Sequence, residues 1–392
     1  MLTSIALMFL VGMVLGGVFQ RLHLPSLVGM IVTGIILGPY ALNLLDESIL
    51  IISPDLRQIA LVIILFRAGL SLDTDDLKTI GLPAVLMSFV PALFEIAAIV
   101  LIAPLLFGIS TIDAAVMGAV VAAVSPAVVV PSMLRIMEKG YGRKRRVPQL
   151  ILAGASVDDI FVIVLFSSFM TIAMGGDLSA TNFLEIPLSI VTGIVVGIGS
   201  GWLLIKLYQT LHLRDSVKII MLLSVSFLLL ELEQQLKGIL PMSGLLAIMS
   251  MGLAINQFYP VLAKRLSLRY NQLWVGAQIL LFVLVGASVN LSYAIQAGLP
   301  VILLIAIALI LRMVGVLVSV APSSLTPKEK LFTMLSYTPK ATVQAAIGAI
   351  PLAMGLESGT LILTVAVLAI LLTAPLGSFA IEKTYPKLLE RD

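Results

Sequence analysis

Two adjacent aspartates lie inside one of the most apolar stretches of the chain. Asp158 and Asp159 belong to the segment GASVDDIFVIVLF, residues 154–166, which carries no other charge. An ionised carboxylate in hydrocarbon is energetically expensive, and two neighbouring carboxylates also repel each other. Charged groups within a membrane usually mark an ion or proton path. The pair therefore predicts a site that a cation and a proton occupy in turn.

Three further ionisable residues fall within apolar segments: Glu95 in PALFEIAAIV, Arg312 in IALILRMVGV and Lys340 in SYTPKATVQ. Adjacent side chains lie about 100° apart on a helix, so the two aspartates cannot both face one partner. We expect Arg312 to pair with one of them, because a guanidinium stays protonated and offers a planar fork to carboxylates. We also expect Glu95 and Arg312 to form an ion pair that shapes the site; the alternative is a pair that serves helix packing alone.

Prolines interrupt two of the apolar segments. Pro126 follows Ser125 in VVAAVSPAVVVPSM, and Pro339 stands in YTPKATVQAAIG. A proline removes an internal hydrogen bond and breaks a helix, which a bilayer tolerates only where protein or water satisfies the freed backbone. We expect Ser125, Thr342 and freed carbonyls to line a cation site beside these prolines. Lys340 then compensates the carbonyl ends of the broken helices.

Several other groups carry weaker signals. Tyr337 and Gln344 flank the second proline break and either contact the ion path or pack. The basic run 143–146 is more typical of a topology anchor than of a sensor. Three acids at a helix end favour a solvated terminus over cation attraction: Asp73, Asp75 and Asp76.

The composition is that of a membrane protein. Of 392 residues, 60% are hydrophobic and 11% charged, and the mean hydropathy is +1.14; a soluble protein carries about 25% charged residues. Apolar runs of roughly 20 residues recur, which predicts an all-α polytopic bundle, and the alternating strands of a barrel are absent. Without cysteine, and with histidine only at 23 and 212, thiol chemistry and a histidine metal centre are excluded, and we expect no cofactor.

Charged, proline and glycine residues divide the apolar runs into about thirteen predicted spans. The eighth and ninth leave almost no room for a loop between them, and no loop is long enough for a soluble domain. The expected limits are 2–20, 26–45, 53–71, 81–107, 112–137, 148–174, 183–208, 216–236, 238–258, 270–290, 299–320, 327–351 and 357–382.

Basic residues concentrate in alternate loops, which predicts the orientation of the chain. Even-numbered loops hold essentially Lys237 alone. The positive-inside rule then places the odd loops and the C-terminus in the cytoplasm and the N-terminus outside, in the plasma membrane. This alternation also makes nucleic-acid binding a poor explanation of the basic surplus. The odd loops and the tail carry Arg21, Lys78, Lys139, Arg143, Lys144, Arg145, Arg146, Arg214, Lys218, Lys264, Arg265, Arg269, Lys328, Lys330, Lys383, Lys387 and Arg391.

Two trios of spans share one plan. The fourth to sixth spans bear an acid, a proline break and the aspartate pair; the eleventh to thirteenth bear Arg312, a proline break and a final helix. Because seven spans separate them, the trios have opposite orientations, as in the inverted repeats of secondary transporters. We therefore expect residues 81–174 and 299–382 to form two inverted three-helix repeats.

Six segments together resemble one family, the NHA-type sodium/proton exchangers of the cation/proton antiporter superfamily. They are VSPAVVVPSM (124–133), GASVDDI (154–160), the span with Arg312, PKATVQAAIG (339–348), LVGMIVTGIILGPYAL (27–42) and LFRAGLSLD (65–73). The resemblance implies a homodimer in which residues 1–71 and 183–290 form the dimerisation part of each protomer. It also implies that the two repeats form a six-helix core transport domain with crossed broken helices and elevator-like transport, and the short loops indicate a prokaryotic relative.

The same resemblance assigns roles to residues of the site. It implies that Asp159 is the principal sodium ligand, with Asp158 beside it, and that Glu95 and Arg312 are the family's ion pair. Many bacterial relatives with electrogenic exchange carry lysine at the arginine position, so Arg312 favours electroneutral exchange. A second titrating group would have to be Asp158 or Glu95.

We therefore expect an antiporter of sodium or lithium against protons, and no enzyme. A potassium/proton antiporter of the same fold and a sodium-coupled organic anion symporter remain alternatives. An intramembrane aspartyl protease is disfavoured because its two aspartates stand on separate helices, and a channel because no charged ring or filter-like loop is present.

Overall fold

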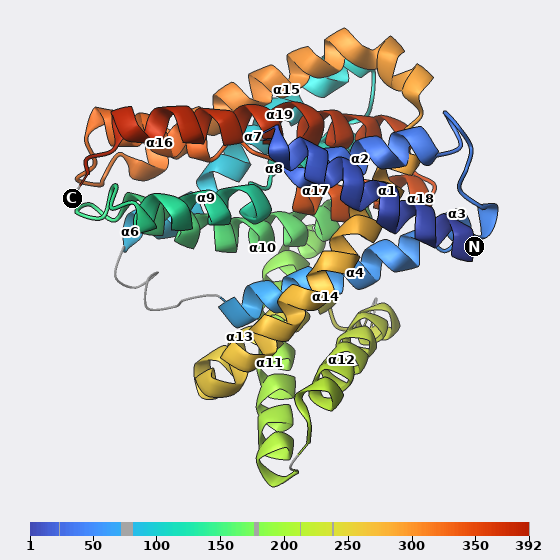
Figure 1. Cartoon of the computed structure of the whole chain (residues 1–392), viewed down its shortest axis with the longest axis vertical. Helices are drawn as coiled ribbons and strands as arrows, with labels where there is room; N and C mark the ends of the chain where they lie inside the picture. The colour runs from blue at the N-terminus through green and yellow to red at the C-terminus, as the bar shows by residue number, and fades with distance from the viewer. Residues whose placement is uncertain (23, 72–80, 176–179, 212, 237–238, 392) are drawn as a thin grey trace. The chain divides into compact units, whose positions relative to one another are not determined.

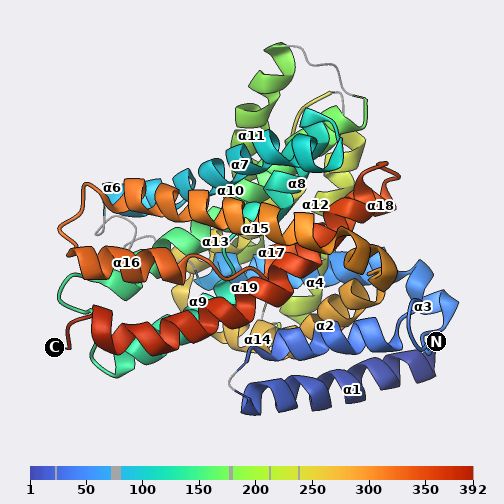
Figure 2. The same cartoon turned by 90° about the horizontal axis from the view of Figure 1, so that it is seen from above.

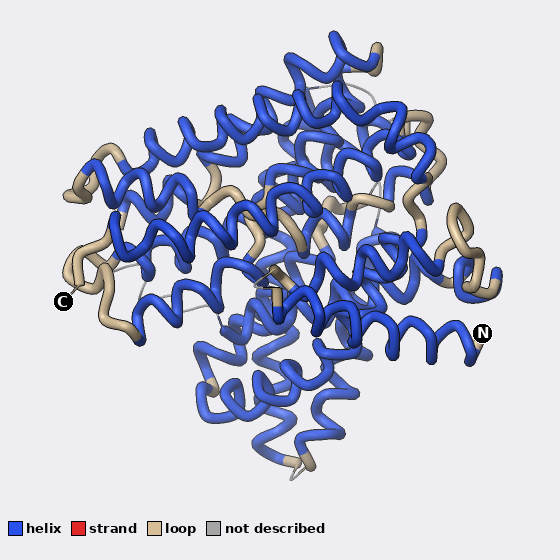
Figure 3. The backbone as a smooth tube through the Cα atoms, turned by 45° about the horizontal axis from the view of Figure 1, so that its top comes forward, coloured by secondary structure: helices blue, strands red, loops and turns tan. Residues whose placement is uncertain are grey.

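The computed structural model describes residues 1–22, 24–71, 81–175, 180–211, 213–236 and 239–391, which form helices joined by turns and loops (Figure 3). No strand occurs among these residues, and the predicted all-α fold is confirmed. Both histidines, Lys78, Lys237 and the acids of 73–76 lie outside the described residues.

Each predicted span overlaps at least one described helix. Eight helical stretches in the described chain are long and apolar enough to cross a membrane, and three shorter apolar helices accompany them. The number of membrane crossings stays a prediction. The eight are Leu2–Arg21, Leu82–Phe107, Thr111–Glu138, Val147–Ala173, Leu188–Thr210, Pro260–Ala287, Ser292–Val320 and Gly359–Leu388.

The chain divides into two compact units. Unit 1 comprises Met1–Pro54, Asp73–Met174 and Ile279–Asp392, which includes both predicted core segments and also residues 1–54. This unit includes the last residues of α14 (Pro260–Ala287). Its other helices are α1 (Leu2–Arg21), α2 (Ser26–Leu37), α3 (Glu47–Ile51), α6 (Leu82–Met87), α7 (Val90–Phe107), α8 (Thr111–Ala122), α9 (Pro126–Glu138), α10 (Val147–Ala173), α15 (Leu291–Val320), α16 (Pro327–Ser336), α17 (Thr342–Ile347), α18 (Ile350–Ala353) and α19 (Gly359–Leu388).

Within unit 1 the helices of the two predicted trios pack on one another. α7 packs along α15, and α10 contacts α6, α8 and α9. α19 runs beside α16 in both views and also contacts α8 and α9 (Figures 1 and 2). One apolar cluster joins these helices through buried residues such as Met133, Val147 and Phe332. The halves of this unit therefore share one core rather than two separate ones.

Unit 2 comprises Asp55–Leu72 and Gly175–Gln278. It contains most of α4 (Ser53–Ser71), α11 (Ala180–Thr210), α12 (Asp215–Leu236), α13 (Gly244–Phe258) and the first part of α14 (Pro260–Ala287). α11 lies closely against α13, and the glycine at position 197 permits this approach, since a Cβ there would collide with the Ala247 carbonyl. The rings of Phe66 and Tyr270 are in tilted contact with centroids 4.7 Å apart, which joins α4 to α14.

Several helix limits differ from the expected spans for local reasons. The expected span 26–45 is helical only to Leu37, because Gly38 is extended and Pro39 cannot donate a backbone hydrogen bond. The span 81–107 is two helices, and Pro91 lies in the first turn of the second. α14 begins at Pro260 rather than near residue 270. Lys264, Arg265 and Arg269 are therefore helical rather than part of a loop, as is Lys218 in α12; their side of the membrane stays a prediction.

Both expected proline breaks are present, and they meet. α8 ends at Ala122 and α9 begins with Pro126, so residues 123–125 are unwound. α16 ends at Ser336 and α17 begins at Thr342, with Pro339 between them. The Ser125 N–H donates to the Pro339 carbonyl over 2.8 Å. The breaks thus satisfy part of each other's freed backbone, as crossed broken helices do.

Candidate functional site

Four buried charged side chains surround the meeting point of the two breaks. Glu95 comes from α7, Asp158 from α10 and Arg312 from α15, while Lys340 stands in the unwound segment before α17. All four are fully buried. Buried charges of this kind are stable only when they are paired and hydrogen-bonded.

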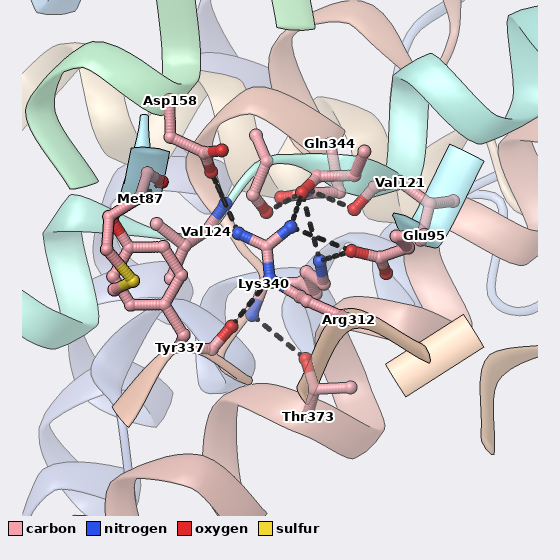
Figure 4. A network of polar contacts seen from close by, with 12 residues as sticks. Met87, Glu95, Val121, Val124, Asp158, Arg312, Tyr337, Lys340, Gln344 and Thr373 are labelled. Carbon is pink, nitrogen blue, oxygen red and sulfur yellow. Dashed lines mark hydrogen bonds and ion pairs between the residues drawn. The ribbon is translucent and has the colours of Figure 1, made fainter. Parts of the chain in front are cut away.

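Arg312 holds the network together (Figure 4). Its Nη1 lies 2.8 Å from Glu95 Oε2, and its Nη2 lies 2.8 Å from Asp158 Oδ2. Its Nε donates to the Tyr337 carbonyl over 2.8 Å, and the guanidinium faces the Tyr337 ring. The planar fork of arginine reaches all these acceptors at once, which the point charge of a lysine could not do.

Lys340 completes the network from the second break. Its Nζ lies 2.5 Å from Glu95 Oε2, and its backbone N–H donates to Thr373 Oγ1 on α19 over 2.9 Å. Two carboxylates, Glu95 and Asp158, therefore face two cations. With all four groups ionised, the network carries no net charge.

Asp159 stands outside this balance. It is partly exposed, whereas its neighbour Asp158 is fully buried. Its Oδ1 atom is buried and has no hydrogen-bond partner among the described residues, which also supply no ion pair for this carboxylate. The two aspartates differ as their 100° separation on α10 requires. One is anchored, and the other is the single carboxylate of the site without a counter-charge.

Five side-chain oxygens of the site residues accept no hydrogen bond. Glu95 Oε1, Asp158 Oδ1, Asp159 Oδ1, Ser125 Oγ and Thr342 Oγ1 are buried and lack a partner among the described residues. Carboxylate and hydroxyl oxygens are the donors that a hard cation takes. These atoms could hold a sodium ion, as a transported substrate.

The backbone carbonyls at the end of α8 are already occupied. Val121 O and Ala123 O accept hydrogen bonds from Gln344 Nε2 over 2.9 and 2.8 Å. Ala122 O accepts from Arg312 Nη1 and, over 3.3 Å, from Lys340 Nζ. Each of these three carbonyls therefore already accepts a hydrogen bond, and the expectation that freed carbonyls line the cation site stays a prediction. The Val124 N–H, by contrast, donates to Asp158 Oδ2 over 2.8 Å and helps to anchor that carboxylate.

The sequence analysis gave no firm role to three residues that the structure brings into the network. Gln344, Tyr337 and Thr373 all bond to groups of the breaks or to Arg312. The Tyr337 hydroxyl also donates to the carbonyl of Met87, the last residue of α6, over 3.4 Å. The polar run from Tyr337 to Gln344 was a usable signal, but nothing local distinguished Thr373 from other threonines.

The expected set of buried charges was also incomplete. Arg57 in α4, Lys218 in α12 and Glu329 in α16 are buried as well. Glu329 accepts from the Thr326 N–H over 2.7 Å and forms a capping box, and the sequence TPKE carries the signature of that motif. Glu329 also pairs with Arg145 over 3.0 Å, outside the network around Arg312.

The comparisons with known proteins bear on the family of the chain. The family model described as "Sodium/hydrogen exchanger, transmembrane" matches residues 5–384. Sodium/hydrogen exchanger 9B2 of Mus musculus is 33% identical over 384 residues, which cover 94% of this chain and 69% of the relative. Sodium/hydrogen exchanger 9B1 of Homo sapiens is 31% identical over 384 residues, covering 94% of this chain and 73% of the relative.

A solved structure shows the same fold. The sodium proton antiporter MjNhaP1 from Methanocaldococcus jannaschii, at pH 8, superposes with a TM-score of 0.85. The alignment covers 99% of this chain and 98% of that one, at 21% identity. The likeness therefore extends from end to end of both chains.

Proposed function

This chain belongs to the sodium/hydrogen exchanger family, and we propose that it exchanges sodium ions for protons across the plasma membrane. Cation/proton antiport is the activity that the family and the fold support. The observation that carries the proposal is the carboxylate of Asp159, which has no ion-pair partner in the described part of the chain and lies next to Asp158 of a charge-balanced network. Asp159 is the group for which cation and proton compete.

The competition follows from the charges around Asp159. Its carboxylate adds one negative charge to a network that is otherwise neutral. Either a sodium ion or a proton removes this charge, and both cannot do so together. Sodium binding therefore expels the proton, and protonation releases sodium. Asp158, held by Arg312 and Val124, contributes Oδ1 as a ligand while it stays ionised.

One titrating carboxylate makes the exchange one for one. A second proton would have to be bound by Asp158 or Glu95, and protonation of either would disrupt an ion pair at 2.5 to 2.8 Å. Breaking a buried pair in this way costs about 3–5 kcal/mol. We therefore propose electroneutral exchange, in which the loaded site carries the same charge with either substrate. Lithium, with the same charge and a smaller radius, is a further substrate.

The transport cycle is proposed to be elevator-like. In this proposal residues 81–174 and 299–382 move as one core domain, and Asp158 and Asp159 face the two sides of the membrane alternately. Residues 1–71 and 183–290 form the dimerisation part of a homodimer, with the N-terminus outside and the C-terminus in the cytoplasm. The shared apolar core of the helices in unit 1 supports a rigid carrier.

The test is ion-driven proton flux in proteoliposomes. Protein is reconstituted with an internal pH dye, and sodium, lithium and potassium gradients are applied over a pH series. Asp159→Asn keeps the size of the side chain but removes its charge, so sodium-driven flux should fall to background. Asp113→Asn changes an acid in the first turn of α8, remote from the breaks, and should transport as the wild type does. Near-normal flux in Asp159→Asn would refute the assignment.

The same vesicles decide the stoichiometry and the alternatives. One-for-one exchange should proceed at a rate that does not change when the membrane potential is clamped at different values. A rate that follows the voltage would show unequal charges. Flux driven by potassium alone would replace sodium by potassium as the substrate, and sodium-driven uptake of an organic anion without proton movement would make the protein a symporter.

A further inference from the structure

The end of α8 offers three carbonyls that are natural cation ligands. The last carbonyls of a helix have no donor within the helix, and in transporters such unwound backbone coordinates sodium. Here the carbonyls of Val121, Ala122 and Ala123 point out of the end of α8, next to the unwound segment with Ser125. A cation seated near Ser125 would find them within reach unless another donor takes them first.

Gln344 takes two of these carbonyls. Its Nε2 donates to Val121 O over 2.9 Å and to Ala123 O over 2.8 Å, from the first turn of the α17 helix (Figure 4). Its Oε1 accepts the Ala341 N–H over 2.8 Å, and the side chain is fully buried. Both amide hydrogens and the amide oxygen are thus used. A flipped amide would set its oxygen against two carbonyls, so only one orientation satisfies every contact.

The third carbonyl, of Ala122, is covered by the two cations of the network, Arg312 and Lys340. Side-chain oxygens of Glu95, the two aspartates, Ser125 and Thr342 remain without a hydrogen-bond partner among the described residues and are available to a cation. A cation site with few ligands, some of them charged carboxylates, favours a small ion. Carboxylates compensate best for the hydration free energy that a small ion loses on binding. Additional carbonyl ligands would make the cation site larger and its electrostatic field weaker, which suits potassium.

We propose that Gln344 is a positioning residue that sets cation selectivity by holding the carbonyls of Val121 and Ala123 away from the ion. It acts through the backbone of α8 and does not touch the cation. This inference deepens the proposed exchange and rests on it. The Gln344 amide keeps the two carbonyls from coordinating the ion, and it does so without occupying the cation site itself.

The test compares apparent KM values for sodium and potassium in proteoliposomes. Gln344→Met keeps the length of the side chain but removes both donors, so the two carbonyls become free to coordinate. The ratio of the potassium KM to the sodium KM should fall by about fivefold or more, the factor produced by a free-energy difference the size of one net hydrogen bond. If Gln344→Met does not fold, Gln344→Asn replaces it, because its amide is too short to reach both carbonyls. The same fall in the ratio is expected.

Thr373→Val is the matched control. It removes the hydrogen bond that ties the Lys340 N–H to α19, and so loosens the same unwound segment, but it leaves the carbonyls of α8 bonded. Its KM ratio should stay that of the wild type even where its rate falls. A Gln344 variant whose two KM values change by the same factor, or whose maximal rate alone falls, would overturn the inference. Wild-type protein without flux for any alkali cation would instead refute the proposed exchange, and the inference with it.

Discussion

At the scale of single residues, the site separates two tasks that adjacent aspartates could have shared. Asp158 is fixed by Arg312 and the Val124 N–H, each over 2.8 Å. Asp159, one position along α10, has no counter-charge among the described residues. The separation depends on Arg312, because only its fork reaches Glu95, Asp158 and the Tyr337 carbonyl together. Two adjacent aspartates can therefore have different roles, because one is held in an ion pair and the other is not.

Replacing Arg312 tests this dependence on the fork. In Arg312→Lys one ammonium cannot serve two carboxylates and the Tyr337 carbonyl, so buried acceptors lose their partners. We expect sodium-driven proton flux to fall by about tenfold or more and the free energy of unfolding to fall by about 1–3 kcal/mol. Thermal unfolding in detergent and flux in vesicles measure the two effects. Arg269→Lys, an exposed arginine of α14, should change neither. Full activity of Arg312→Lys would mean that a single positive charge is sufficient.

At the scale of helices, a second set of charged contacts ties the two trios together where α9 and α19 end and α10 and α16 begin. Arg145, just before α10, lies 3.0 Å from Glu329 Oε2, and the Glu329 side chain is 3% exposed. Glu329 also accepts from the N–H of Thr326 over 2.7 Å and so caps α16. The Gly142 N–H donates to the Glu390 carbonyl over 2.9 Å, which fastens the segment after α19. These contacts therefore fix α9 and α16 at the ends that lie away from the two breaks.

Arg145→Gln should therefore reduce stability more than an exposed pair does. It leaves the Glu329 carboxylate buried with only the capping contacts, and a lost charged hydrogen bond of this kind is worth about 1.5–3 kcal/mol. Arg135→Gln removes the pair with Glu382, whose side chains are 55% and 36% exposed, and should cost less than about 1 kcal/mol. Thermal unfolding of both variants in one detergent gives the comparison. Equal losses would show that burial of Glu329 does not matter.

Local patterns explain which helix features could be predicted. Pro126 and Pro339 predicted both breaks, because a missing N–H acts within one turn. The start of α14 was missed, because the basic residues after Pro260 look like a loop although they are helical. The contacts of Gln344 with Val121 and of Lys340 with Thr373 join residues 223 and 33 positions apart. No periodicity encodes such contacts, so the buried acids and their pairing with Arg312 were predictable, whereas the contacts of Gln344 and Thr373 were not.

At the scale of the whole molecule, the absence of cysteine allows a direct test of the predicted orientation. Each single cysteine introduced into this chain is the only thiol, so labelling reports one position. Three exposed positions lie in segments with different predicted sides: Leu44 after α2, Lys144 before α10 and Lys387 near the end of α19. The positive-inside rule places Leu44 outside and the two lysines in the cytoplasm.

A membrane-impermeant maleimide applied to intact cells should label Leu44→Cys and should not label Lys144→Cys or Lys387→Cys until the cells are permeabilised. Leu2→Cys, at the exposed start of α1, should be labelled from outside as well. Termini on opposite sides require an odd number of crossings, so this pattern also tests the count of about thirteen. Labelling of Leu2→Cys and Lys387→Cys from the same side would make the count even. The two trios need not then have opposite orientations, and the alternating access of Asp158 and Asp159 would lose its structural basis.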